Sequence, residues 1–178
     1  MRKSLLATVL TCAVLLLTAC AIQWATIIAT AEAISQLVVV ADPSAAKVAK
    51  ISQMAVTGLQ VIEQTYNAYE SDKTGTGKLA AFEAAVLAFQ QNLPAELAAA
   101  QISNPTTKAA VTAAVNIVLD WVDALAGQVP QLSKKTAANR SRRGTGEIPS
   151  KPLMKSQIVA RWKTEVCRGD STCAALVH

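Results

Sequence analysis

The chain of 178 residues carries a formal net charge of +5, and 52% of its residues are hydrophobic but only 4% are aromatic. Its single histidine is the terminal His178, and the sequence has no serine-triad or zinc-helix motif, so we expect neither an enzyme nor a bound cofactor. An alanine-rich composition that is poor in Gly and Pro favours helices. We therefore predict an all-α protein with one domain and a tail.

The first 20 residues have the layout of an export signal. Arg2 and Lys3 precede an apolar run over residues 5–17, and the run ends in Leu17-Thr18-Ala19-Cys20. A charged start, a short apolar segment and a small residue at the cleavage site are typical of a secretory signal peptide. The last four residues resemble the lipobox of bacterial lipoproteins.

This resemblance covers residues 1–20 only. It implies that a signal peptide over residues 1–19 is removed and that the thiol of Cys20 carries a diacylglyceryl group, with a further acyl chain on the new amino terminus. Two or more acyl chains anchor a protein stably in a membrane. By resemblance to Gram-negative sorting rules, Ala21 in place of Asp implies the periplasmic face of the outer membrane. The alternatives are an ordinary cleaved signal without lipidation and an uncleaved membrane helix over residues 5–24.

Residues 20–129 are expected to form an antiparallel bundle of about four helices. Apolar side chains recur at spacings of three and four, which is the period of a helix with one buried face. These stripes run from Trp24 to Val38, from Val48 to Tyr69, from Leu79 to Leu93 and from Val111 to Leu125. Short turns between them favour up-and-down topology. The first helix could instead lie on the membrane.

Local signals predict where the helices begin and end. Asp42-Pro43 and Asn104-Pro105 each place a capping side chain before a proline at the first helical position. Pro94 is expected to end or kink the third helix, with a short continuation to Gln101, because the residue before a proline avoids helical geometry. Gly127 is expected to end the fourth helix.

Two pairs of acidic residues could serve acid–base chemistry only if their side chains converge. Asp120 and Asp123 belong to the fourth predicted helix, and Glu63 and Glu70 belong to the second. All four fall on faces away from the apolar stripes, where we expect solvated side chains.

Residues 72–83 resemble in part the calcium loop of an EF-hand. Asp72 takes position 1, Gly77 position 6 and Glu83 position 12, and predicted helices flank the segment. Positions 3 and 5 hold Thr74 and Thr76 where carboxylates or amides normally bind the ion, so only weak calcium binding is expected. The alternative is an ordinary turn between two helices.

Residues 130–152 are predicted to be a flexible basic linker, because they combine charge with no apolar periodicity. Residues 21–127 hold five basic and nine acidic residues, whereas residues 128–178 hold ten basic and three acidic ones. The cluster could contact anionic lipid or the cell wall. Nucleic acid is not expected, because no aromatic residue interleaves the cluster to stack bases. The cluster consists of Lys134, Lys135, Arg140, Arg142 and Arg143.

Residues 153–178 are predicted to form an amphipathic helix followed by a disulfide loop. The apolar face from Ile158 to Val166 could lie on an anionic surface or dock against a helix. Removal of the signal and lipidation of Cys20 leave only Cys167 and Cys173, which export would deliver to an oxidising compartment.

The sequence thus predicts a non-catalytic envelope lipoprotein, anchored through Cys20, that acts as a structural or protein-interaction module. One alternative is a membrane-perturbing protein of lysis or toxin type, whose first helix and Trp162 helix insert into the bilayer. The other is a weak calcium-binding module that uses residues 72–83.

Overall fold

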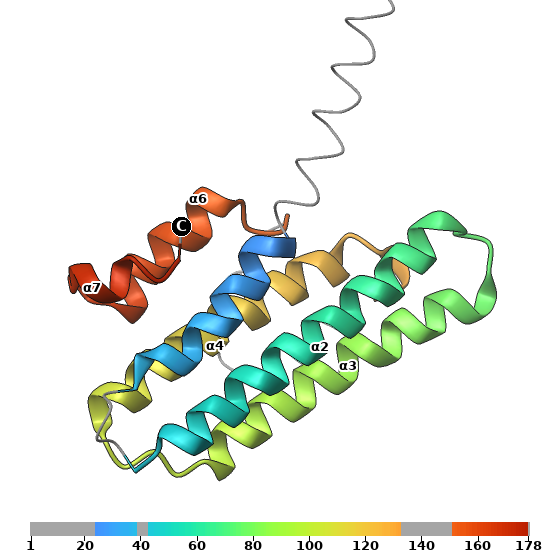
Figure 1. Cartoon of the computed structure of the whole chain (residues 1–178). Helices are drawn as coiled ribbons and strands as arrows, with labels where there is room; N and C mark the ends of the chain where they lie inside the picture. Colours follow the sequence, from blue (N-terminus) through green and yellow to red (C-terminus); the bar gives the residue numbers. More distant parts are fainter. Residues whose placement is uncertain (1–23, 39–42, 133–150, 178) are drawn as a thin grey trace, which may run out of the picture.

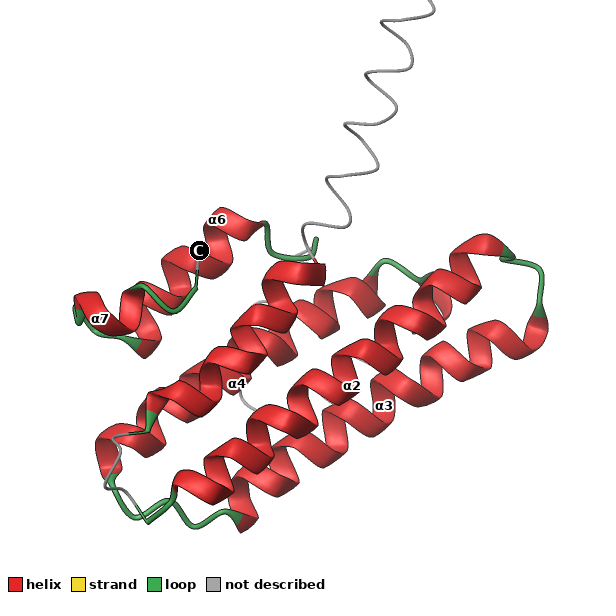
Figure 2. Ribbon diagram, in the orientation of Figure 1, coloured by secondary structure: helices red, strands yellow, loops and turns green. Residues whose placement is uncertain are grey.

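The computed structural model describes residues 24–38, 43–132 and 151–177. Within these ranges all regular secondary structure is helical, which confirms the predicted all-α fold (Figure 2). Three features of the sequence lie outside the described residues: the lipobox with Cys20, the capping residue Asp42 and the basic cluster of residues 134–143.

The described helices follow one another through short connections. A helix over residues 24–33 continues as a 3₁₀ turn, η1. Three long helices form the body, and a π-helical segment, η2, extends the first C-terminal helix. The elements are η1 (Ile34–Leu37), α2 (Ala45–Ser71), α3 (Thr76–Ala99), α4 (Pro105–Gly127), α6 (Lys155–Arg161), η2 (Trp162–Val166) and α7 (Ser171–Ala174).

The long helices pack as an antiparallel bundle (Figure 1). α2 and α3 form a hairpin with the most extensive helix–helix contact, and η1 lies against both α2 and α4. η2 also packs on α4, and Figure 1 shows the C-terminal helices across α4 from α2 and α3. α4 is therefore enclosed between the other helices of the bundle and the C-terminal helices.

This central position explains the apolar character of α4. It is the one described helix that is long and apolar enough to cross a membrane, and 67% of its most apolar stretch is buried inside the protein. The helix over residues 24–33 is also packed into the core, where Ile27 and Ala31 are fully buried together with Ile34 of η1. Its apolar face is occupied by the bundle.

An aromatic cluster joins the helix over residues 24–33 to all three long helices at one end of the bundle. The rings of Trp24 and Trp121 meet edge to face with centroids 4.8 Å apart, and Trp24 also contacts Tyr66. The ring centroid of Phe82 in α3 lies 5.4 Å from that of Tyr66, and the Phe82 ring stacks on the ring of Tyr69. Such ring pairs stabilise by about 0.5–1.5 kcal/mol beyond the area they bury.

The predicted helix starts were right for α4 and wrong for α2. The side chain of Asn104 accepts hydrogen bonds from the backbone N–H groups of Thr106 and Thr107, at 2.9 and 3.1 Å. α2 begins at Ala45, with Ser44 at the N-cap and Pro43 before it. Ser44 is buried, so packing of this turn sets the start two residues later than the proline signal indicated.

Pro94 lies inside α3, which runs from Thr76 to Ala99, so the helix does not end at the proline and continues to within two residues of Gln101, in agreement with the predicted continuation. A proline inside a helix loses one backbone hydrogen bond and crowds the carbonyl four residues earlier. Burial on both sides outweighs this cost, because Leu93 is fully buried and Leu97 packs on the core one turn later.

The expected solvation of Asp123 was also wrong. Its side chain is buried, and its carboxylate accepts a hydrogen bond of 2.6 Å from Nε2 of Gln90 in α3. Asp123 is covered because α4 has neighbours on opposite sides. A helical-wheel argument assumes one buried face and fails for a helix in this position.

Candidate functional site

Residues 151–177, here called the C-terminal unit, dock on α4. Ile158 and Trp162 are fully buried and Val166 is nearly so, which confirms the predicted amphipathic character of this segment. η2 makes its contacts with α4. The apolar face predicted to seek a membrane or a partner helix is therefore covered by the protein's own bundle.

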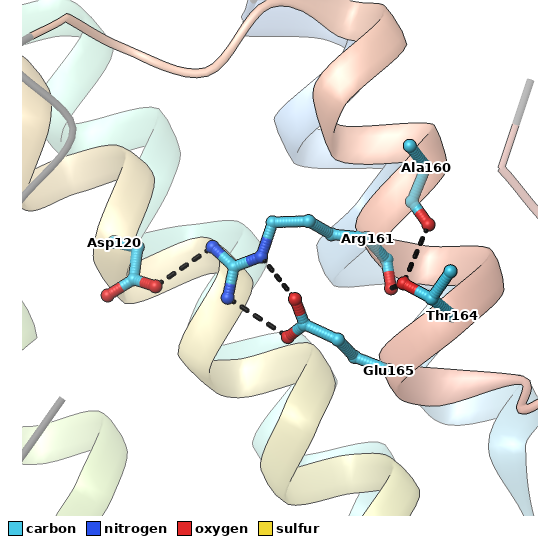
Figure 3. Close-up of polar contacts among 5 residues, drawn as sticks. All are labelled: Asp120, Ala160, Arg161, Thr164 and Glu165. Carbon is cyan, nitrogen blue, oxygen red and sulfur yellow. Dashed lines mark hydrogen bonds and ion pairs between the residues drawn. The ribbon is translucent and has the colours of Figure 1, made fainter. Parts of the chain in front are cut away.

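Arg161 links the C-terminal unit to the body (Figure 3). Its Nη1 donates to Asp120 of α4 at 2.9 Å, while Nε and Nη2 donate to the two carboxylate oxygens of Glu165 at 2.6 and 3.0 Å. The hydrogen bond to Glu165 is the main cause that raises the pKa of Arg161 above its usual value. Asp120 and Asp123 thus have different hydrogen-bond partners, Arg161 and Gln90 respectively.

A disulfide joins Cys167 and Cys173, as predicted, with Cα atoms 5.4 Å apart. Gly169 adopts a φ of +96°, a left-handed conformation that glycine reaches without steric cost. Asp170 caps α7 by accepting from the N–H groups of Thr172 and Cys173. The indole N–H of Trp162 donates to the carbonyl of Cys173 at 3.2 Å, which ties the loop to η2.

A hollow of about 480 Å³ lies beside this loop, between η1, the start of α4 and α7. Polar side chains of Asn104 and Asp170 line it, but both already cap helices. Oδ1 of each side chain accepts these capping hydrogen bonds.

An apolar groove of about 480 Å³ runs between α2 and α3. Met54, Val61 and Ala88 contribute to its walls, and Val61 is 44% exposed. Gly58 lets the ring of Phe89 lie directly on α2, since a Cβ at this position would come within 2.3 Å of Cδ2 of Phe89.

The segment that resembles a calcium loop forms a short turn. α2 ends at Ser71 and α3 begins at Thr76, so Glu83 lies inside α3, about 10 Å along the helix axis from its start. Asp72 accepts from the hydroxyl of Thr74 at 2.9 Å and pairs with Nζ of Lys78 at 3.1 Å. These bonds hold the pKa of Asp72 below its usual value, with the Thr74 bond as the largest cause.

The outer face of α6 and the start of η2 carries a shallow depression. It is lined by Lys155, Ser156, Val159, Ala160 and Lys163. Sequence reasoning assigned the anionic contact to residues 134–143 or to the apolar face from Ile158 to Val166, and did not single out this face. The spacing of Lys155, Val159 and Lys163, four residues apart each time, was the available signal.

Within the described ranges, no three His, Cys, Asp or Glu residues group so as to hold a metal ion. Comparison with known proteins adds no relative: no protein-family model, no curated protein and no solved structure matches this chain.

Proposed function

We propose that this protein is a non-catalytic lipoprotein of the cell envelope, anchored through acyl chains on Cys20, whose helical bundle serves as a structural or protein-interaction module. The observation that carries the proposal is Leu17-Thr18-Ala19-Cys20 at the end of an apolar run of signal-peptide length. The Cys167–Cys173 disulfide supports export, since such bonds persist in oxidising compartments.

The short distance between the anchor and the first described helix supports a body held at the membrane. Only three residues separate Cys20 from Trp24, where the described helix begins. At most about 14 Å of extended chain connects their Cα atoms. A tether of this length keeps the bundle beside the bilayer.

The packing of the helices favours this function over membrane perturbation. Insertion of the first helix would remove Trp24 from its contacts with Tyr66 and Trp121. Insertion of the helix containing Trp162 would expose α4 and break the ion pair between Arg161 and Asp120. The apolar surfaces that a lytic protein needs are used to build the fold.

Mass spectrometry of the protein extracted from membranes tests the proposal. We expect a chain that starts at residue 20 and carries the mass of two or three acyl chains on its first residue. Cys20→Ser should abolish the acyl mass, whereas Cys12→Ser, within the predicted signal, should leave it unchanged. A wild-type chain that retains residues 1–19, or an unmodified Cys20, would contradict lipid anchoring.

A further inference from the structure

We propose that the outer face of α6, here called the lysine face (Lys155, Ser156, Val159, Ala160 and Lys163), binds the anionic headgroups of the bilayer that holds the anchor. The proposal rests on the lipid anchoring proposed above. It assigns the membrane contact to a folded surface of the C-terminal unit, on the side away from the residues that dock on α4.

The lysine face has the composition that an anionic interface requires. Lys155 and Lys163 are exposed at either end of the depression, and the residues between them are small or apolar, with no acidic side chain in the lining. Glu165, the acidic residue of η2, is held by Arg161. Met154, which is 57% exposed, lies immediately before α6 and adds an apolar side chain. Basic and apolar groups together favour binding at a lipid headgroup surface.

Contacts with α4 place the lysine face at the level of the anchor. Trp24 packs on Trp121, and Arg161 pairs with Asp120, the preceding residue of α4. The first described residue and the C-terminal end of α6 therefore meet α4 at the same turn. Cys20 lies only four residues before Trp24, so a bilayer that holds it lies near this end of the bundle.

Because the bilayer lies close to the lysine face, we assign lipid headgroups, and not an acidic protein, as its ligand. Attraction to an anionic surface falls off within about 10 Å at ordinary ionic strength, so only charges close to the bilayer contribute. Lys47 and Lys108 are exposed near the opposite end of the bundle, at the starts of α2 and α4. Lys108 is 12 residues before Asp120, which is about 18 Å along α4. These two lysines serve as internal controls.

Lysine labelling in vesicles tests the proposal on the lipidated chain. The protein is reconstituted into vesicles of phosphatidylcholine alone or with one part in three of phosphatidylglycerol, and modification of each lysine is followed by peptide mass spectrometry. We expect labelling of Lys155 and Lys163 to slow several-fold in anionic vesicles, and 0.5 M salt to reverse this. Labelling of Lys47 and Lys108 should stay unchanged. Equal rates at Lys155 and Lys163 in both vesicle types would overturn the proposal and leave the face to an acidic protein.

A second experiment separates this proposal from lipid anchoring. A chain that begins at residue 20 with Cys20→Ser keeps every described residue but has no acyl group, and its flotation with the same vesicles measures the protein surface alone. Lys155→Gln with Lys163→Gln should weaken flotation with anionic vesicles by roughly tenfold or more. The matched pair Lys47→Gln with Lys108→Gln should not. If both pairs behave alike, the lysine face is not the binding surface, whatever the acyl mass at Cys20.

Discussion

Gly58 illustrates how a single residue shapes the α2–α3 hairpin. Its missing side chain lets Phe89 pack on the backbone of α2, at a distance where a Cβ would overlap the ring. Alanine normally favours a helix over glycine by about 1 kcal/mol. At Gly58 the steric overlap with Phe89 should outweigh this gain. Gly58→Ala should therefore destabilise the protein, whereas Gly→Ala at a helix position with free space should stabilise it.

We therefore expect Gly58→Ala to lower the free energy of unfolding by about 1–3 kcal/mol, the range for overpacked cores. Urea denaturation monitored by circular dichroism measures it. Gly77→Ala in α3 is the matched control, because no atom lies within 4 Å of a Cβ built there. The control should be neutral or slightly stabilising. Equal effects at both positions would show that the ring of Phe89 moves aside freely.

Arg161 is a second residue that its closest substitute, lysine, should not replace without loss of stability. Its guanidinium binds both oxygens of Glu165 and also reaches Asp120, a geometry that one ammonium group cannot reproduce. Arg161→Lys should lower the free energy of unfolding by about 1–2 kcal/mol. Lys73→Met removes the exposed ion pair with Glu70 and should change it by less than about 0.5 kcal/mol. An Arg161→Lys protein as stable as wild type would mean that the network contributes little.

Asp72 provides a prediction on pH. Hydrogen bonds from Thr74 and Lys78 lower its pKa in the folded state. Its contribution to stability is therefore present above the pKa of the unfolded chain and is lost as the pH falls through the lower, folded pKa. Carbon-detected NMR titration should find the carboxyl pKa below the usual aspartate range. Thr74→Ala should raise it, while the neighbouring exchange Lys73→Met should affect it less.

Among the secondary-structure elements, those with local signals were the ones that sequence reasoning predicted well. α4 begins after Asn104 and ends at Gly127 because a cap with a following proline and a terminal glycine act within a few residues. The burial of Asp123 was missed, and the proline signal did not tell whether α3 would end at Pro94 or continue through it. Both depend on neighbours that are distant in sequence, which no local pattern reports.

The lysine face, too, could not be predicted from local sequence patterns alone. The basic amphipathic character of α6 was visible in the sequence, but its apolar and basic groups were assigned to one binding surface. Docking on α4 covers Ile158 and Trp162 and leaves Lys155 and Lys163 outside. Which side of a short helix remains open is determined by tertiary packing.

Loss of the Cys167–Cys173 disulfide should destabilise only the C-terminal end of the protein. Cys167 and Cys173 close a loop of seven residues, for which chain entropy predicts about 2 kcal/mol of stabilisation. In the double variant Cys167→Ser, Cys173→Ser we expect faster amide hydrogen exchange over residues 167–177 and unchanged exchange in α2 and α3. Uniformly faster exchange throughout the bundle would contradict a local role.

At the scale of the whole molecule, α4 is the element on which the others converge. η1, α3 and η2 all contact it, and its buried carboxylate on Asp123 is bound by Gln90 of α3. Gln90→Met removes this hydrogen bond to a buried carboxylate, so it should lower the free energy of unfolding by about 1–3 kcal/mol. Gln91→Met, on the exposed side of α3, should have little effect in the same denaturation experiment.

The contact between Trp24 and Trp121 also has a consequence for the order of assembly. The first helix meets α2 early in the chain, through the contact of Trp24 with Tyr66 and the hydrogen bond from the Ser52 hydroxyl to the carbonyl of Ala31. Its contact with Trp121 instead joins residues that are 97 positions apart. Pairing across so long a separation is slow, and apolar surface left open in the meantime invites aggregation. The helix over residues 24–33 is therefore expected to complete its packing only when α4 folds against it.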